Sequence, residues 1–368
     1  MNLHGLRIAL VGPLPPPEGG MANQMRQLGE LLRGEGALIT LIQVNAPYYP
    51  AWIGRLRGLR AIFRFVPYVI RLWRVAGEVD LFHIMANSGW SWHLFAAPAV
   101  WIASMRGVGT VVNYRGGEAE TFLARSGRLV RATLRRANVL AVPSGFLQKV
   151  FSKWGVGSEV VPNIIDLKRF RPSSASRSPA GAHVVVARAF EAIYDIPTAL
   201  RAFSLVHVEI PESRISLAGS GPERENLLSL AKDLGIAEAV TFCGSLTRDA
   251  MSELYRSASV VINPSQVDNM PNSVLEAMAS GVPAVSTNVG GVPYVLEDGV
   301  TGLLVPACDH VAMANAVKRV LRDADLAHGL RHAALREVKK YSWAQVRQRW
   351  IEVYALALAR PSVETRLT

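Results

Sequence analysis

Cysteine is scarce in this chain of 368 residues, which has two, Cys243 and Cys308. They are too few and too isolated in the sequence to build a disulfide framework or a zinc site. We therefore expect a protein that folds without covalent cross-links or a structural metal, as suits a reducing cytoplasm.

Long hydrophobic runs and a secretion signal are also missing. The most apolar window, residues 94–105, is shorter than the roughly 20 residues of a membrane-spanning helix, so it predicts a buried helix. The first residues, MNLHGLRIALVG, lack the charged start, apolar run and cleavage site of a secretory signal. The sequence thus predicts a cytoplasmic protein without a transmembrane segment.

Metal-ligand patterns are equally sparse. The one Asp-x-Asp pattern, Asp323 and Asp325, falls near the end of a predicted helix and has no further ligands nearby. His83 and His93 stand among apolar residues, where a structural histidine is expected, although His83 at a strand end would also be able to contact a substrate. We expect neither a metal nor a cofactor.

Acidic residues are absent from positions 36–77, where arginines alternate with aromatic and aliphatic residues. Helical spacing puts most of these arginines on one face, and Pro67 is expected to kink or restart the helix. A basic face opposite Trp and Phe is typical of a helix on a membrane surface, but it also fits a surface helix whose apolar face packs on the core. Both interpretations stay open for these arginines: Arg55, Arg57, Arg60, Arg64, Arg71 and Arg74.

The net charge of +11 prompts the hypothesis of nucleic-acid binding. No nucleic-acid module is recognisable, and the basic residues gather beside aromatic residues in one segment. We therefore expect no nucleic acid as a partner. We expect instead an anionic membrane surface, with the protein bound peripherally to the inner face of the membrane.

Apolar residues are abundant: half of the chain is hydrophobic and the mean hydropathy is +0.19. Such a composition suits parallel sheets, whose strands are buried on both faces. Strand-like runs alternate with helix-like runs in both halves of the chain, which indicates doubly wound α/β domains. The predicted strands are 6–11, 38–42, 80–84, 110–113, 139–142, 159–161, 183–187, 214–218, 239–242, 260–262, 284–286 and 303–305.

A Pro/Ser/Ala-rich linker without hydrophobic periodicity, PSSASRSPAGA, follows Arg171 and separates the two series of strands. A length of 368 residues also favours two domains over one. We predict a first domain of residues 1–170, a second domain of residues 171–342 and a last helix over residues 343–359.

Residues 263–291 carry the strongest functional signal. Two carboxylates, Asp268 and Glu276, flank a predicted helix start between two predicted strands. In a parallel sheet the loop after a strand faces the ligand crevice, and the first N–H groups of the following helix attract an anion. The two carboxylates therefore flank a candidate phosphate site.

This stretch resembles the donor-binding signature of the family 4 retaining glycosyltransferases, in which two acids bracket the start of a helix that holds a nucleotide-sugar. The resemblance runs from the Gly19 loop to about Asp309. It implies the GT-B fold: two Rossmann-like domains that face each other across a cleft, with the last helix crossing back to the first domain. It also implies that Glu276 binds the nucleotide ribose and that Asp268, where the family usually has Glu, faces the sugar hydroxyls.

A structural interpretation of Glu276 stays open beside the functional one. Ser273 and Glu276 fit a capping box, in which the glutamate reaches back to the N–H group of the helix cap.

Further motifs follow in the order that the family has. The resemblance implies that glycines approach the donor closely, that Cys243 lines the base pocket as a small apolar wall and that the helix start after Asn272 holds the diphosphate. The expected donor-binding positions are Gly19, Gly20, Asn163, Gly219, Gly221, Cys243, Gly244, Asn272, Ser273, Glu276, Gly290 and Gly291.

The chain departs from the family at the cations that neutralise the diphosphate leaving group. The family commonly has Arg followed five residues later by Lys, and here Arg188 is present but Ile193 takes the Lys position. Either another cation replaces the lysine, with Lys168, Arg169 and Arg115 as candidates, or turnover is slow, or the chain is a degenerate member.

Arg115 marks a second departure, because many relatives have His before the glycine that follows it. It would serve an acidic or phosphorylated acceptor, or else be a solvated residue at a strand end.

The resemblance implies a retaining hexosyltransferase, with Asp268, Arg188 and Arg115 in the catalytic centre. It would use a nucleotide-diphosphate sugar without a metal. The basic aromatic segment suggests a lipid-linked saccharide acceptor, as in bacterial polysaccharide assembly. A nucleotide-sugar epimerase on the same architecture is the alternative function.

Overall fold

The computed structural model describes residues 1–16, 19–47, 52, 60–173 and 181–359. It divides into two compact units. The first contains Met1–Ile164 and the chain from Ala344 onward, and the second contains Ile165–Trp343, so the second unit begins ahead of the predicted boundary at residue 171. The predicted linker lies largely outside the described residues, as do Arg55 and Arg57.

The first unit is built on a six-stranded parallel sheet with the strand order β2-β1-β3-β4-β5-β6. Each predicted strand of the first series is present, because buried parallel strands are continuous apolar runs in the sequence. β2 lies on one side of β1, and the chain then crosses to the other side, where β3, β4, β5 and β6 follow in sequence order. The strands are β1 (Arg7–Gly12), β2 (Leu38–Gln43), β3 (Leu81–Ala86), β4 (Gly109–Tyr114), β5 (Val139–Val142) and β6 (Glu159–Val160).

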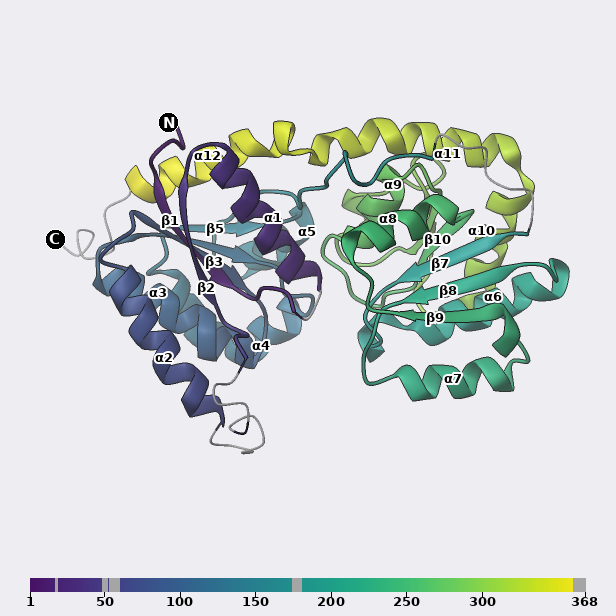
Figure 1. The fold of residues 1–368 in the computed structure, drawn as a ribbon, viewed down its shortest axis with the longest axis horizontal. Helices are drawn as coiled ribbons and strands as arrows, with labels where there is room; N and C mark the ends of the chain where they lie inside the picture. The colour runs from purple at the N-terminus through teal and green to yellow at the C-terminus, as the bar shows by residue number, and fades with distance from the viewer. Residues whose placement is uncertain (17–18, 48–51, 53–59, 174–180, 360–368) are drawn as a thin grey trace. The chain divides into compact units, whose positions relative to one another are not determined.

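Helices cover both faces of this sheet, as Figure 1 shows. α2 (Arg60–Val75), α3 (Ala97–Met105) and α4 (Ala119–Leu134) pack on one face, against buried residues such as Val11, Phe82 and Val112. α1 (Gly20–Gly34) lies on the other face, where Gly29 lets it approach Leu10 closely. α5 (Gly145–Lys153) follows β5.

α12 (Trp343–Ala359), which forms over the predicted residues, packs on the sheet of the first unit through buried polar and aromatic contacts. His83 in β3 is fully buried; its Nδ1 lies 2.9 Å from the Tyr354 hydroxyl, and its ring centroid lies 4.7 Å from that of Trp350. The expectation of a structural histidine is therefore confirmed. The alternative, that His83 contacts a substrate, is wrong because the side chain has no exposed surface.

The hydrogen bonds of Asn113 assign the tautomer of His83. Arg115, which can only donate, gives its Nε hydrogen to Asn113 Oδ1 at 3.1 Å. The amide nitrogen of Asn113 therefore donates to His83 Nε2 at 3.0 Å, which leaves the proton on Nδ1 to donate to Tyr354. Burial and the charge of Arg115 lower the pKa of His83 to about 3, so the ring is neutral.

The second unit has a second six-stranded parallel sheet, in the order β12-β11-β10-β7-β8-β9. β7 and β10 are neighbours, and the chain builds outward from them in opposite directions. The strands are β7 (His183–Ala187), β8 (Arg214–Ala218), β9 (Val240–Gly244), β10 (Val260–Asn263), β11 (Ala284–Thr287) and β12 (Leu303–Val305).

Two helical layers enclose the second sheet (Figure 1). The hydrophobic cluster on one face includes residues of α6 (Ile196–Glu209), α7 (Arg224–Asp233) and α10 (His310–Arg322). The other face is covered mainly by α8 (Arg248–Ser257) and α9 (Asn272–Ala279), and α11 (Ala324–Glu337) contributes to both clusters. This is the doubly wound arrangement that the sequence predicts.

Two local predictions need correction. α2 does not restart at Pro67 but runs through it; Pro67 is exposed, so the carbonyl group that it leaves without an intrahelical bond can reach water. The window 94–105 is helical, but it begins as part of a π-helical turn, Trp92–Ala96, and Trp101 and Met105 are exposed.

Among the described residues, no helix combines the length and the apolar character needed to cross a membrane. The same residues contain no group of three or more His, Cys, Asp or Glu side chains that could hold a metal ion.

The buried contact between His83 and Tyr354 predicts a stability effect. Tyr354→Phe would leave the Nδ1 hydrogen of His83 buried without an acceptor, so the free energy of unfolding should fall by about 1 to 3 kcal/mol. Denaturant unfolding followed by tryptophan fluorescence measures this change. Tyr294→Phe, at an exposed tyrosine, is the matched control, and an equal effect of both variants would contradict the prediction.

Candidate functional site

Polar and charged side chains gather at the carboxyl edge of the second sheet, where β7 and β10 end. Arg188 directly follows β7, Asn263 is the last residue of β10, and Asp268 lies in the loop after β10. The chain leaves these two neighbouring strands in opposite directions, which makes this edge the topological switch point of the sheet. Ligands of open α/β sheets bind at such points.

Arg188 is held by three groups. Its Nε donates to Asn263 Oδ1 at 2.8 Å, its Nη2 forms an ion pair with Asp268, and its guanidinium carbon lies 4.8 Å from the ring centroid of Tyr194. Burial lowers the pKa of Arg188, but a guanidinium keeps its charge in proteins. The structure therefore places a fixed positive charge at the switch point.

Asn263 is itself fixed by buried hydroxyl groups. Its Nδ2 donates to Ser286 Oγ at 2.9 Å, and its Oδ1 also accepts from Ser265 Oγ at 2.9 Å. Thr287 Oγ1 donates to the carbonyl of Ser265 at 2.6 Å. This network joins the ends of β10 and β11, so the guanidinium of Arg188 is oriented by the framework of the sheet.

Glu276 points from α9 to a buried tyrosine of α8. The Tyr255 hydroxyl donates to Glu276 Oε2 at 3.1 Å. Burial raises the pKa of Glu276 to about 7, although Tyr255, Arg248 and Arg188 each act to lower it. This carboxylate therefore titrates near neutral pH.

The capping-box interpretation of Glu276 does not hold. The cap of α9 is Pro271, which makes no side-chain cap hydrogen bond, and Ser273 lies inside the helix rather than at its cap. Ser273 Oγ is buried without a hydrogen-bond partner among the described residues. The carboxylate of Glu276 binds Tyr255 instead of the backbone at the helix start.

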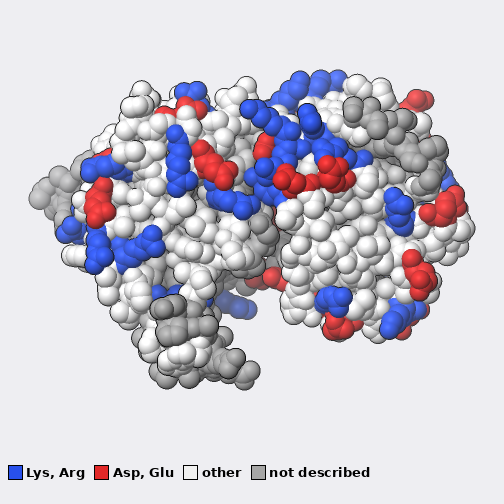
Figure 2. All heavy atoms as spheres, viewed as in Figure 1, with Lys and Arg blue, Asp and Glu red and all other residues white. Residues whose placement is uncertain are grey.

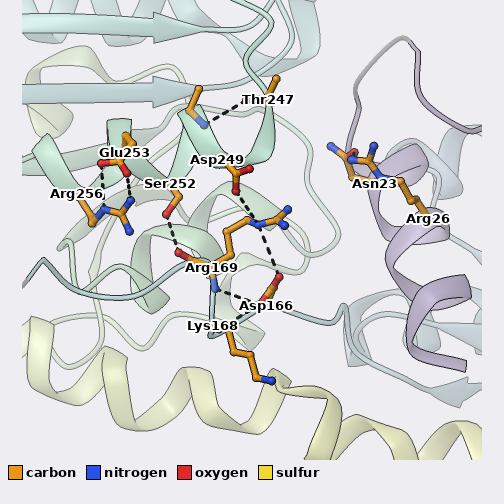
Figure 3. A network of polar contacts seen from close by, with 11 residues as sticks. Asn23, Arg26, Asp166, Lys168, Arg169, Thr247, Asp249, Ser252, Glu253 and Arg256 are labelled. Atoms are coloured by element: carbon orange, nitrogen blue, oxygen red, sulfur yellow. Dashed lines mark hydrogen bonds and ion pairs between the residues drawn. The ribbon is translucent and has the colours of Figure 1, made fainter. Parts of the chain in front are cut away.

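The cations proposed to replace the family lysine are placed as follows. Arg169 Nε lies 3.1 Å from Asp249 Oδ1 and 3.9 Å from Asp166 Oδ2, so its charge is engaged by two carboxylates. Figure 3 shows this network, with Lys168 pointing away from the pair of Arg169 and Asp249. That one of these cations replaces the family lysine stays a prediction.

Arg248 is a cation that the sequence analysis missed. It opens α8, and its charge lowers the pKa of Glu276, which puts it within electrostatic reach of that carboxylate. Its guanidinium carbon lies 5.9 Å from the ring centroid of Phe170. Ile193 stands at the position of the family lysine and has no charge. Its backbone carbonyl accepts a hydrogen bond from the Gln266 N–H group at 2.9 Å.

Gly219 and Gly221 are required by close packing of backbone on backbone. A Cβ atom on Gly219 would lie 1.9 Å from the carbonyl oxygen of Arg188, and one on Gly221 would lie 2.4 Å from that of Phe190. These glycines therefore let the loop after β8 lie directly against the segment that carries Arg188.

The loops on either side complete this edge. Gly244, with φ of 66°, ends β9 beside the partly buried free cysteine Cys243. The carbonyl of Gly244 accepts from the Gly219 N–H group at 2.9 Å. Gly291 donates its N–H to the carbonyl of Asp268 at 2.8 Å, and Gly290 has φ of 52°. The structure thus brings together the predicted positions of the second unit, with Asn272 as the first residue of α9.

In the first unit, the predicted residues lie at the carboxyl edge of the first sheet or beside it. Gly19 is the cap of α1, and a Cβ atom there would meet no described atom within 4 Å. Arg115 follows β4; its Nε binds Asn113 and its Nη1 binds the side chain of Asn163. Arg115 is partly buried, and burial lowers its pKa to about 10, so its side chain is not fully solvated.

The chemistry of the edge in the second unit suits a ligand that carries both phosphate and hydroxyl groups. A guanidinium and the start of α9 attract anionic oxygens, and carboxylates accept hydrogen bonds from hydroxyls. Tyr194, Arg248, Tyr255 and Asn263 belong to this arrangement, yet none of them lies in a motif that singles it out in the sequence.

The family match lies in the second unit. Residues 169–337, just under half of the chain, match the sequence profile of the family described as "Glycosyl transferases group 1". An uncharacterized glycosyltransferase of Methanocaldococcus jannaschii is 34% identical over 152 residues, which cover 41% of this chain and 39% of the relative. A D-inositol 3-phosphate glycosyltransferase of Salinispora tropica is 38% identical over 143 residues, or 39% of this chain and 30% of the relative. The matches thus span well under two thirds of these relatives.

Solved structures match nearly the whole chain. Sucrose-phosphate synthase from Thermosynechococcus elongatus superimposes with a TM-score of 0.78 at 22% identity, over 96% of this chain and 99% of that one. HepE of Anabaena, solved in complex with UDP-glucose, has a TM-score of 0.75 at 16% identity, over 95% of this chain and 99% of that one. Residues 169–337 therefore match the glycosyl transferases group 1 family, and the chain shares the GT-B fold of these solved structures.

Proposed function

We propose that this protein is a retaining glycosyltransferase that moves a hexosyl unit from a nucleotide-diphosphate sugar to a lipid-linked saccharide in bacterial polysaccharide biosynthesis. One observation carries the proposal: in the unit that matches the family, Arg188, Asp268 and Glu276 converge at the switch point of the sheet. The complexes of HepE with UDP and UDP-glucose support a nucleotide-sugar as the donor class.

Each charged residue has a role in the proposed reaction. Glu276 accepts hydrogen bonds from the ribose, and Asp268 faces the sugar hydroxyls. Arg188 and the N–H groups at the start of α9 stabilise the charge that develops on the departing diphosphate. The acceptor oxygen bonds to the anomeric carbon on the leaving-group side, the bond from that carbon to the phosphate oxygen breaks, and the acceptor proton passes to the phosphate.

The first unit is proposed to serve the acceptor and the donor phosphates. The described residues do not require a glycine at position 19, because a Cβ atom there would meet none of their atoms within 4 Å and φ is −173°. A close approach of the donor is the proposed reason for Gly19 and Gly20. Arg115, fixed by Asn113 and Asn163, would offer its charge to an acidic or phosphorylated acceptor.

A binding and turnover experiment tests this function. The wild-type protein is heated with UDP-, GDP- and ADP-sugars, and a donor at about 100 times its dissociation constant should add roughly 2.7 kcal/mol of stability. Products of the best donor are then analysed with and without a lipid-linked saccharide. Sugar transfer supports the proposal, isomerisation of the donor without acceptor would establish the epimerase alternative, and binding of none of these donors would contradict both.

An anionic membrane surface is the proposed partner of the first unit. α2 buries Tyr68, Leu72 and Val75 in the core but leaves a second apolar row uncovered. Phe63, Val66, Ile70 and Trp73 are each about half-exposed, and their spacings of three and four residues put them on one face of the helix.

The charges beside this apolar row favour anionic lipid as its occupant. Arg74 is exposed on α2, and the Arg106 guanidinium carbon lies 5.0 Å from the ring centroid of Trp73. Arg71 is also exposed and donates to the carbonyl of Leu41 at 2.8 Å. Basic residues near a membrane surface attract anionic lipid at about 1 kcal/mol each, and exposed aromatic residues insert at the interface. Figure 2 shows one face of the molecule, on which basic side chains lie among acidic ones.

Replacement of Glu276 tests its role. Glu276→Gln should weaken nucleotide binding by about ten- to a hundredfold, because hydrogen bonds to a charged acceptor contribute roughly 1.5 to 3 kcal/mol. Since the carboxylate forms as the pH rises through about 7, wild-type affinity should increase over that range. Calorimetric titration from pH 5.5 to 8.5 measures both effects. The glutamine variant also controls for titration of the nucleotide, so identical pH profiles of the two proteins would count against this role.

Replacement of Arg188 tests the leaving-group role. Arg188→Ala should lower turnover by about two to three orders of magnitude, the usual loss when one preorganised donor to a developing charge is removed. Ile193→Lys, which restores the family pattern, should cause no loss. Arg322→Ala, at an exposed arginine at the end of α10 in the same unit, is the control. Turnover that is indifferent to Arg188→Ala would place the diphosphate elsewhere.

The membrane proposal predicts two separable components of binding. Replacing Phe63 and Ile70 with Gln should reduce co-sedimentation with anionic vesicles at all salt concentrations, whereas Arg74→Glu with Arg106→Glu should weaken it mainly at low salt. Leu129→Gln, at an exposed leucine of α4 in the same unit, is the matched control. Nucleotide-sugar binding should not change. Equal co-sedimentation of all variants would leave α2 as a helix that only packs on the core.

A further inference from the structure

Arg188 already has an anionic partner in the protein without ligand. The Asp268 carboxylate forms an ion pair with Arg188 Nη2, and the two side chains are 10% and 12% exposed. The cation proposed to stabilise the leaving diphosphate is therefore neutralised before any donor arrives.

This ion pair is fixed from both sides. Arg188 is oriented by Asn263 and by the ring of Tyr194, while the backbone of Asp268 accepts a hydrogen bond from Gly291 at 2.8 Å. A phosphate that approaches the Nη2 of Arg188 competes with the Asp268 carboxylate for that group. A ligand must therefore bind Arg188 strongly enough to compete with the Asp268 carboxylate.

Breaking a buried ion pair is unfavourable, since the group left behind keeps its charge without a partner. A ligand with one weak anionic group gains little by replacing a carboxylate. A diphosphate brings more negative charge and can also bind the N–H groups at the start of α9. A site can select one ligand by attracting it directly, or by an internal interaction that only this ligand is able to displace.

We propose that Asp268 is a specificity-determining residue that competes with the donor for Arg188, so that donor binding is an exchange of anions at that guanidinium. The proposal rests on the proposed donor function and adds a second role for Asp268. The diphosphate takes Arg188, and the released carboxylate becomes available to the sugar hydroxyls. A nucleoside diphosphate without sugar must displace the Asp268 carboxylate at the same cost in free energy, but it gains no contact between the released carboxylate and a sugar.

The exchange predicts that removal of a carboxylate from the donor site will strengthen the binding of a free nucleoside diphosphate. Asp268→Asn keeps the size of the side chain and removes its charge, so its dissociation constant for UDP, GDP or ADP, whichever binds the wild type best, should fall at least about tenfold, an interaction of roughly 1.4 kcal/mol. Asp268→Glu keeps the charge and should bind like the wild type. Sugar transfer by Asp268→Asn should fall, because the contact to the sugar is lost.

A second background separates exchange from simple charge repulsion. In Arg188→Gln no guanidinium is left to be competed for, so adding Asp268→Asn should not strengthen nucleotide binding further. Repulsion between Asp268 and the phosphates, by contrast, would give the same gain in both backgrounds. The double variant removes both charges of the pair, so it also provides a measurement if Asp268→Asn alone does not fold.

Glu209→Gln is the matched control. Glu209 also forms ion pairs in the second unit, with Lys318 and Arg322, but it ends α6, about 20 Å along that helix from its start after β7. The nucleotide affinity of Glu209→Gln should equal that of the wild type.

The outcomes are distinguishable by isothermal titration calorimetry with the full chain. If no nucleotide binds the wild type, the proposed donor function itself fails. If nucleotides bind the wild type and Asp268→Asn binds them equally or more weakly, the donor function stands and the exchange is overturned. An equal gain in the Arg188→Gln background would overturn it as well.

Discussion

The parallel pairing of β7 with β10 is the constraint on which the candidate site depends. The chain leaves these neighbours in opposite directions, which makes their carboxyl ends a switch point, where ligands of open α/β sheets bind. Residues that follow the two strands meet there although they are far apart in the sequence: Arg188 and Asn263 are one such pair. Most of these polar groups are buried, and each charge is therefore held by another group of the same edge.

The architecture could be predicted from the sequence because one physical signal repeats along it. Strands that are buried on both faces are short apolar runs, and glycine, proline or a polar residue ends them. The predicted strands 139–142, 183–187, 214–218 and 303–305 coincide with the observed ones, and the helix Trp343–Ala359 does as well. The loop positions of the candidate site followed from the same alternation, since loops after parallel strands share one edge.

Side-chain partners could not be predicted in this way. Tyr255 and Glu276 are 21 positions apart, and their contact depends on how α8 and α9 pack against each other. Tyr194 is one residue from the missing lysine position, but its stacking on Arg188 follows from the short helical turn Ala192–Tyr194. The partners of Arg169, Asp166 and Asp249, likewise depend on packing within the second unit. Such contacts leave no periodic trace in the sequence.

The contact between His83 and Tyr354 has a consequence for synthesis of the chain. His83 emerges from the ribosome early, whereas the hydroxyl that accepts its proton belongs to α12, after the whole second unit. At about 5 to 20 residues per second, the first sheet would wait roughly 10 to 40 seconds for that helix. The second unit is synthesised during that interval, and every residue of its hydrophobic clusters, up to Tyr341, precedes Tyr354 in the chain. The domain that starts first along the chain is thus the one that is finished last.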